Sequence, residues 1–224
     1  ETLDEGIGGF TEVYKTRVVL PLMASEWERR HVLRHELVHA MQFFVLYGEG
    51  MRSYTLYKSI LIPLWFTEGM AEYFSNDYSA EGDMVLRDAV LYDRIPPLEH
   101  LHSFNHLEPH DAYLGYKAGR SAIANIVEKY GEDKPGAMLK AIEEARSFSQ
   151  VFQEKTGVSM KDFEKKWRSH LKETYWVQAS GKKDPDEYGT PVFISPEDRT
   201  CISNSASQSP VDDTIVFLSD KQGF

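Results

Sequence analysis

An HExxH pentapeptide occupies residues 35–39, inside a stretch of sequence that favours an α-helix. On a helix, His35 and His39 lie one turn apart on the same face, with Cβ atoms about 5–6 Å apart. Two imidazoles at that separation can bind one Zn2+ at about 2.0–2.1 Å, and Glu36 can act as general base on a water beside the ion. The motif constrains the fold, because a third ligand must reach this face and one position must stay open for the water.

A further histidine, His31, continues the column at the same spacing of four residues. At a rise of 1.5 Å per residue, His31 and His39 are about 12 Å apart along the helix axis, which is too far for one ion. Only His35 and His39 enclose a glutamate directly after the first histidine. We therefore expect His31 to lie at the surface or behind the ligands.

The third ligand must come from elsewhere in the chain. The longer motif HExxHxxGxxH would supply a histidine, but Gln42 and Val45 stand at its glycine and histidine positions. Residues 50–67 contain no Asp or Glu, and the first carboxylates after that gap are Glu68 and, one helical turn later, Glu72. Aromatic neighbours predict that their helix is mostly buried, where a carboxylate needs a partner such as a dication. Both acids could instead be ordinary surface residues of an amphipathic helix.

The remaining pattern predicts an α+β fold that is mainly helical after residue 63. We expect an edge strand over Tyr14–Leu22, because a proline lies near its end. Ser25, followed by Glu28 three residues later, predicts a capped helix over Glu26–Leu46. Further helices are expected over residues 63–74, 83–92, 118–130, 134–144, 148–155 and 161–175, with a histidine-rich loop over 99–110 and a β-prone run at 214–219.

The composition changes near residue 178, which we interpret as a domain boundary. Residues 1–178 are expected to form one N-terminally truncated domain, and residues 179–224 a polar linker with a short β tail. Because one strand is not stable alone, the run at 214–219 must pair with another segment. The chain begins at Glu1 and not at methionine, so we expect it to be an excised or processed piece of a longer protein.

Composition argues against several classes of partner and site. The net charge is -10, from 35 acidic and 25 basic residues, which argues against a nucleic acid or an anionic membrane as partner. No run of 18 apolar residues occurs, so no membrane span is expected. Cys201 is the single cysteine, which excludes a disulfide or a cysteine-based zinc site within the chain. We expect the protein in the cell envelope, in the periplasm or outside the cell.

The sequence around Glu68 carries a specific resemblance. Residues 64–73, LWFTEGMAEY, resemble the WxxEGxAxY segment of the gluzincin metallopeptidases, a group that includes the M1 aminopeptidases. The resemblance implies that Glu68 is the third zinc ligand and that Glu72 lies behind a ligand histidine and orients it. We expect Gly69 to let the HExxH helix and the Glu68 helix approach closely. The M1 exopeptidase signature GxMEN has no match here, so aminopeptidase activity does not follow.

A wider resemblance, over roughly residues 8–176, is to the peptidase MA-like family of bacterial gluzincins. The sequence segments that carry it are GFT at 9–11, RVVLP at 17–21, VLRHE at 32–36, and looser likenesses at 119–121, 128–131 and 156–167. The resemblance implies a zincin-like catalytic domain. It would have a small N-terminal sheet with an edge strand, an HExxH helix, a helix with the glutamate ligand, and a mainly helical C-terminal part.

The end of the chain has a resemblance of its own. Residues 209–224, SPVDDTIVFLSDKQGF, are similar to the SPDGxxIAFxSDRxG repeat of TolB-like β-propellers of the WD40 type. Peptidase MA-like domains are found fused to such propellers. The resemblance implies that the chain ends inside the first blade and lacks the rest of a C-terminal β-propeller.

These residues predict a zinc-dependent metallopeptidase that acts on a peptide or protein substrate. His35, His39 and Glu68 would hold Zn2+, which lowers the pKa of a bound water toward about 7. Glu36 would take a proton from that water as it attacks a peptide carbonyl, and would pass the proton to the leaving amine. The edge strand could pair with an extended substrate.

The developing oxyanion needs a hydrogen-bond donor as well. Gluzincins often use a downstream tyrosine or histidine, and the candidates here, in order of preference, are Tyr116, Tyr113, His110 and His106. Two alternatives to the peptidase hypothesis stay open. One is a non-catalytic interaction module with a structural or vestigial zinc site, in which the missing propeller binds the partner. The other is a metal-free helical domain.

Overall fold

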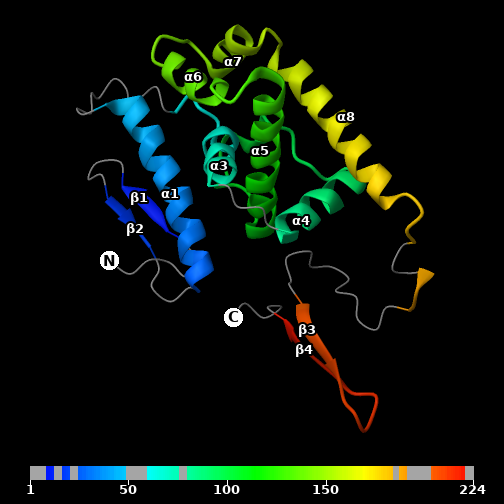
Figure 1. Cartoon of the computed structure of the whole chain (residues 1–224). Helices are drawn as coiled ribbons and strands as arrows, with labels where there is room; N and C mark the ends of the chain where they lie inside the picture. Colours follow the sequence, from blue (N-terminus) through cyan, green and yellow to red (C-terminus); the bar gives the residue numbers. More distant parts are fainter. Residues whose placement is uncertain are drawn as a thin grey trace.

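The computed structural model describes residues 9–12, 17–20, 25–48, 60–75, 80–183, 187–190 and 203–219. Within these ranges it contains seven α-helices, one short 3-10 helix and two antiparallel two-stranded sheets, which confirms the α+β class (Figure 1). In chain order the elements are β1 (Phe10–Glu12), β2 (Arg17–Val19), α1 (Glu26–Tyr47), α3 (Leu64–Phe74), α4 (Ala80–Leu91), η1 (His100–His102), α5 (Pro109–Tyr130), α6 (Lys134–Ala141), α7 (Phe148–Thr156), α8 (Met160–Ala179), β3 (Ser203–Gln208) and β4 (Ile215–Ser219).

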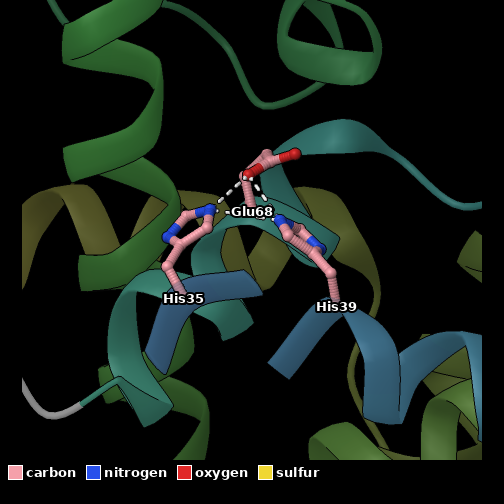
Figure 2. A group of neighbouring side chains, drawn as sticks. All are labelled: His35, His39 and Glu68. Atoms are coloured by element: carbon pink, nitrogen blue, oxygen red, sulfur yellow. Dashed lines mark hydrogen bonds and ion pairs between the residues drawn. The ribbon is translucent and has the colours of Figure 1, made fainter. Parts of the chain in front are cut away.

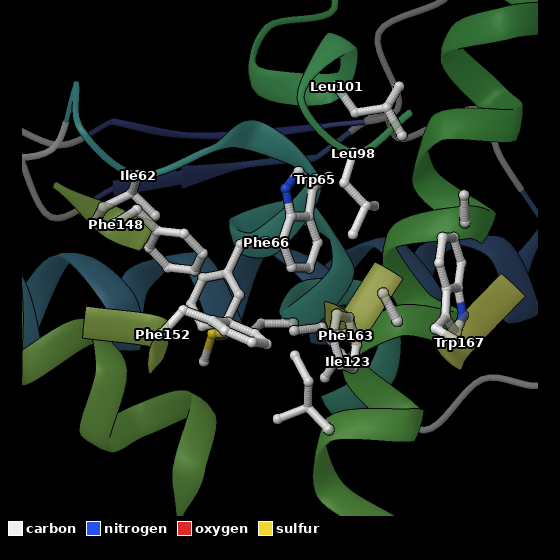
Figure 3. Packing of buried hydrophobic residues seen from close by; sticks show 14 of the residues in the cluster. Ile62, Trp65, Phe66, Leu98, Leu101, Ile123, Phe148, Phe152, Phe163 and Trp167 are labelled. Atoms are coloured by element: carbon white, nitrogen blue, oxygen red, sulfur yellow. The ribbon is translucent and has the colours of Figure 1, made fainter. Parts of the chain in front are cut away.

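Helix α3 lies between α1 and α5 and is the centre of the apolar core (Figures 1 and 3). The side chains of Trp65 and Phe66 are fully buried. The ring of Phe148 in α7 packs against both, with centroids 6.0 Å from Trp65 and 4.7 Å from Phe66. Because burial of a large apolar side chain stabilises a fold by about 1.5–3 kcal/mol, these contacts fix α3 firmly. The core continues through Ile123, Phe152, Phe163 and Trp167.

Helices α3 and α5 approach each other at two glycines. A Cβ atom added to Gly69 would lie 2.5 Å from the backbone carbon of Gly119. One added to Gly119 would lie 2.5 Å from the carbonyl oxygen of Trp65. A larger residue at either position would force the helices apart. Gly69 therefore lets α5 approach α3, and not the HExxH helix α1 as expected, because the atoms nearest to its Cβ position belong to Gly119 and Ile123 of α5.

Helix α1 begins where the sequence predicts. The hydroxyl of Ser25 accepts a hydrogen bond from the backbone nitrogen of Glu28 at 3.2 Å, and the Glu28 carboxylate accepts one from the Ser25 nitrogen at 2.7 Å. This is the predicted capping box. The helix ends at Tyr47, one residue beyond the predicted end, and Gly48 follows with a φ of 62° that favours glycine.

The N-terminal sheet contains part of the expected edge strand. Strand β2 lies within Tyr14–Leu22, and most of the other residues of that range lie outside the described residues. β2 pairs antiparallel with β1, so that Phe10 lies opposite Val19. The sequence pattern does not predict β1. A Cβ atom added to Gly9 would lie 2.6 Å from the side chain of Val32, so the start of β1 packs closely on α1.

The helical part differs from the prediction mainly at α5. The helix predicted over 118–130 begins nine residues earlier, at Pro109, because a proline is well suited to a first turn, where its missing N–H is not needed. The loop predicted over 99–110 is correspondingly shorter and contains η1. The extra turns of α5 carry both candidate tyrosines. None of the helices in the described ranges is long and apolar enough to cross a membrane.

The β-prone tail forms a hairpin. β4 covers residues 215–219 and pairs antiparallel with β3, with Gln208 opposite Ile215. The sequence pattern does not predict β3, because its residues, SNSASQ, include only one apolar side chain, an alanine. The apolar side chains of β4 are exposed. The division of the chain at residue 178 stays a prediction.

Candidate metal centre

Two histidines of α1 and one glutamate of α3 meet at a single point (Figure 2). Nε2 of His35 lies 3.2 Å from Oε2 of Glu68, and Nε2 of His39 lies 3.1 Å from the same oxygen. The two Nε2 atoms are 3.1 Å apart. The structure thus brings together the three residues that were expected to bind the metal; we call them the trio.

The donor atoms of the trio have the spacing that one metal ion needs. Two ligands of a tetrahedral ion, each at about 2.0–2.1 Å from the metal, are about 3.3 Å apart. The three measured separations are close to that value. Within the described ranges, no other group of three or more His, Cys, Asp or Glu side chains has its donor atoms this close together. Two imidazoles and a carboxylate are also a donor set of catalytic zinc sites, so the residues fit a divalent cation of this kind.

The carboxylate and the two imidazoles of the trio shift one another's pKa values toward the charged forms. Burial raises the pKa of Glu68, but hydrogen bonds from the two imidazoles outweigh it and hold this pKa at about 2. Burial lowers the pKa of His35, but the carboxylates of Glu68 and Glu72 outweigh it and raise this pKa to about 9. The pKa of His39 is also raised, since Glu68 outweighs the effect of burial there. A dication would take the place of the protons that these imidazoles share with Glu68.

A buried ion pair lies behind His35. Oε1 of Glu72 is 3.5 Å from Nδ1 of His35, and Oε2 of Glu72 accepts a hydrogen bond from Nζ of Lys117 at 2.6 Å. Burial raises the pKa of Glu72, but His35 and Lys117 hold it at about 2. Glu72 therefore lies where a carboxylate that orients His35 is expected. Lys117 neutralises the charge of Glu72, and the sequence pattern does not single out this lysine.

A neutral amide lies behind His39. Oε1 of Gln42 is 2.9 Å from Nδ1 of His39, and Nε2 of Gln42 donates a hydrogen bond to the carbonyl of Thr67 at 2.8 Å. The sequence pattern marks Gln42 only as the residue at the glycine position of the longer motif HExxHxxGxxH. A signal for this contact was present, because Gln42 follows His39 by three residues and so shares its helical face.

Glu36 is buried and borders the same cavity as His35, and its carboxylate is held by the N-terminal sheet. Its Oε2 lies 2.6 Å from Oγ1 of Thr11 in β1. The same hydroxyl is 3.0 Å from the backbone oxygen of Glu36. Because a hydroxyl has one hydrogen, we assign it to the shorter contact. Thr11 is part of the GFT segment, but nothing local in the sequence indicates a contact across 25 positions.

Two of the four candidate oxyanion donors line a cavity next to the trio. Tyr116 and Tyr113 border a cavity of about 300 Å³ that also reaches His35 and Glu36. The ring of Tyr116 lies 6.3 Å from the ring of His35. Burial, and then nearby carboxylates led by that of Glu68, raises the pKa of Tyr116, so its hydroxyl keeps its proton. Tyr116 therefore borders the cavity beside His35 with a protonated hydroxyl.

The structure does not bring the remaining histidines into the trio. His110 borders a different cavity, between α4 and the start of α5. His106 is exposed. His31 stacks on Trp27 with ring centroids 5.8 Å apart, and its own ring is 6.4 Å from that of His35. It is half-buried and is not part of the trio.

Comparison with known proteins identifies a family. Residues 5–173 match the model of the Peptidase MA superfamily, and this range includes the trio, the buried glutamate and both tyrosines. No curated protein and no solved structure matches the chain. Peptidases of this superfamily typically depend on a metal ion, which agrees with the geometry of the trio. Because the match covers well over half of the 224 residues, the chain belongs to the Peptidase MA superfamily.

Proposed function

We propose that the chain is a zinc-dependent metallopeptidase of the gluzincin type, which hydrolyses peptide bonds. The trio carries the proposal, because its three donor atoms have metal-ligand spacing and its His35 borders the same cavity as the buried Glu36. Two imidazoles and one carboxylate favour zinc over the hard cations, which prefer oxygen alone. Membership of a peptidase superfamily supports a peptide or protein as the substrate.

In this proposal Glu36 moves the proton. When bound, the cation supplies Lewis-acid chemistry that makes a water more acidic. Glu36 accepts a proton from the water while the oxygen of that water adds to the peptide carbonyl carbon. Glu36 then delivers the proton to the amine nitrogen as the C–N bond breaks. Thr11 occupies Oε2 of Glu36, which leaves Oε1 to carry the proton. Strand β1 thereby orients the base.

Two further features have roles in binding and turnover. We propose Tyr116 as the donor to the oxyanion, supported by its protonated hydroxyl and its place in the cavity. An extended substrate would pair with an edge of the β1–β2 sheet, which has two strands within the described residues.

We also propose that the β3–β4 hairpin is the start of a TolB-like β-propeller. The segment that carries this resemblance forms an ordered turn. Oγ of Ser209 accepts a hydrogen bond from the backbone nitrogen of Asp212 at 3.3 Å, and Oδ1 of Asp212 accepts one from that of Thr214 at 2.9 Å. A hairpin with exposed apolar side chains is marginal alone, which supports further strands beside it.

A fluorogenic peptide-library assay on the full chain, with zinc content measured by mass spectrometry, tests the function. We expect bound zinc, cleavage that stops on chelation, and recovery when zinc is restored. Glu36→Gln should keep the zinc and reduce turnover by about 10²–10⁴-fold. The control is Glu128→Gln, which changes an exposed acid on α5 and should leave turnover unchanged. Undiminished cleavage by Glu36→Gln would refute the mechanism, and zinc binding without cleavage by the unaltered chain would favour the non-catalytic module.

A further inference from the structure

We propose that Gln42 is a positioning residue of the metal centre, which orients His39 and ties it to the backbone beside Glu68. The inference rests on the proposed metal site but not on peptidase activity. The HExxH motif gives this residue no role, and its side chain is 2% exposed, so a surface role is excluded.

The partners of Gln42 determine which way its amide faces. The backbone carbonyl of Thr67 can only accept a hydrogen bond, so the side-chain nitrogen of Gln42 must face it, at 2.8 Å. The side-chain oxygen then faces Nδ1 of His39, at 2.9 Å. In the opposite orientation, two oxygens would lie 2.8 Å apart with no hydrogen between them. Only one orientation of the amide satisfies both contacts.

That orientation decides which nitrogen of His39 is the donor. An amide oxygen only accepts hydrogen bonds, so Nδ1 of His39 must carry a hydrogen. A neutral imidazole with its hydrogen on Nδ1 has its free lone pair on Nε2. Nε2 is the atom that lies 3.1 Å from Oε2 of Glu68. Gln42 therefore selects the form of His39 that can bind a metal ion at the trio.

The same side chain links the two helices that carry the trio. Thr67 immediately precedes Glu68 in α3, so the hydrogen bond from Gln42 holds the backbone next to the third ligand. Because the amide is buried, water competes little with this bond. One residue of α1 thus fixes the direction of a ligand on its own helix and the position of a ligand on α3.

The chemistry of an amide is specific to this position. His35 is supported by the carboxylate of Glu72, whereas His39 is supported by an uncharged group. An ionised carboxylate at position 42 could accept from Nδ1 of His39 but could not donate to Thr67. An aliphatic side chain could do neither. Only an amide supplies an acceptor and a donor in one flat group of this length.

The test compares the zinc affinity of the full chain with that of two variants, using zinc alone as the ligand and a chromophoric chelator as competitor. Gln42→Met keeps the side-chain volume and loses both hydrogen bonds, so zinc should bind about 10–100-fold more weakly. Gln42→Glu keeps the acceptor and loses the donor, so its affinity should lie between those of the unaltered chain and Gln42→Met. Gln153→Met, which changes an exposed residue of α7, is the control and should bind zinc normally.

A spectroscopic readout separates positioning from a general loss of stability. In 15N spectra of the zinc-loaded protein, the Nδ1–H signal of His39 should change in both Gln42 variants, while that of His35 stays the same. If Gln42→Met does not fold, Gln42→Glu carries the test alone. Unchanged affinity together with an unchanged His39 signal would overturn the inference. Failure of the unaltered chain to bind zinc would instead overturn the proposed function.

Discussion

Helices α1 and α3 together supply the trio, but the fold holds them in different ways. α3 has 11 residues, of which six are buried: Trp65, Phe66, Gly69, Met70, Ala71 and Glu72. α1 has 22 residues, of which only three are buried: Glu36, Gln42 and Leu46. Two of those three are polar side chains of the candidate site. Apolar packing anchors α3, whereas α1 combines a smaller apolar contact at Leu46 with polar contacts around the metal centre.

The outer face of α1 also differs from α3, because it exposes large apolar side chains. Leu37, Met41 and Phe44 are exposed, although they are among the most apolar residues of the helix. Apolar packing stabilises a helix whether or not a metal is bound, whereas the polar contacts of α1 depend on the charges of the trio. We therefore expect α3 to keep its place in the metal-free protein and α1 to respond to the metal.

Replacing one phenylalanine on each helix should produce the largest difference. Phe66→Ala removes a fully buried ring from α3 and should lower the free energy of unfolding by about 3–5 kcal/mol. Phe44→Ala removes a ring that is 64% exposed on α1 and should change it by less than about 0.5 kcal/mol. Urea unfolding followed by circular dichroism measures both values. Equal losses would show that α1 is packed as firmly as α3.

Removal of the metal should have the next largest effect. Zinc at about a hundred times its Kd should raise the free energy of unfolding by about 2.7 kcal/mol, and a chelator should reverse the gain. Amide hydrogen exchange in the metal-free protein should become faster in α1 and change little in α3, because α3 has more buried apolar side chains than α1. Equal acceleration in both helices would contradict the contrast.

A smaller effect is expected from the charged support of His35. Glu72→Gln keeps the shape of the side chain but removes the charge that faces His35 and Lys117, so zinc affinity should fall about tenfold, or about 1.4 kcal/mol. The exposed acid Glu128 serves again as the control through Glu128→Gln. Adding Lys117→Met to Glu72→Gln should restore stability, because it removes a buried charge without a partner, but not zinc affinity. Normal zinc binding by Glu72→Gln would show that only the amide on the other side matters.

The smallest expected effect is the pH dependence of the metal-free protein. The pKa of His35 is raised from 6.5 to about 9 on folding, so its contribution to stability is complete below pH 6.5 and is lost as the pH rises through about 9. Between pH 6.5 and about pH 7.5 the free energy of unfolding should fall by about 1 kcal/mol. Chemical unfolding at a series of pH values measures this. His35→Gln should make the profile less steep, because only the contribution of His39 then remains, and a stability that rises over this interval would contradict the direction.

Much of the site could be predicted because it depends on neighbours in the chain. The spacing of His35 and His39 is set by the helical repeat, and the capping box that starts α1 lies within four residues. The segment around Glu68 was informative through its resemblance to gluzincins. The wider resemblance over roughly residues 8–176 indicated membership of the peptidase MA family, which is confirmed. The strand β3 was missed because its polar residues show no alternation with apolar ones, and pairing with β4 is what makes it a strand.

The side chains that orient the site residues could not be predicted, because they come from distant positions in the chain. Thr11 reaches Glu36 and Gln42 reaches Thr67, each across 25 positions, and Lys117 reaches Glu72 across 45. Each of these side chains is common on protein surfaces, and nothing beside it in the chain indicates its partner. Helical periodicity and caps were therefore enough to locate the candidate ligands. The groups that orient them emerge only when packing of α1 against β1 and α3, and of α3 against α5, places distant donors and acceptors within hydrogen-bond range.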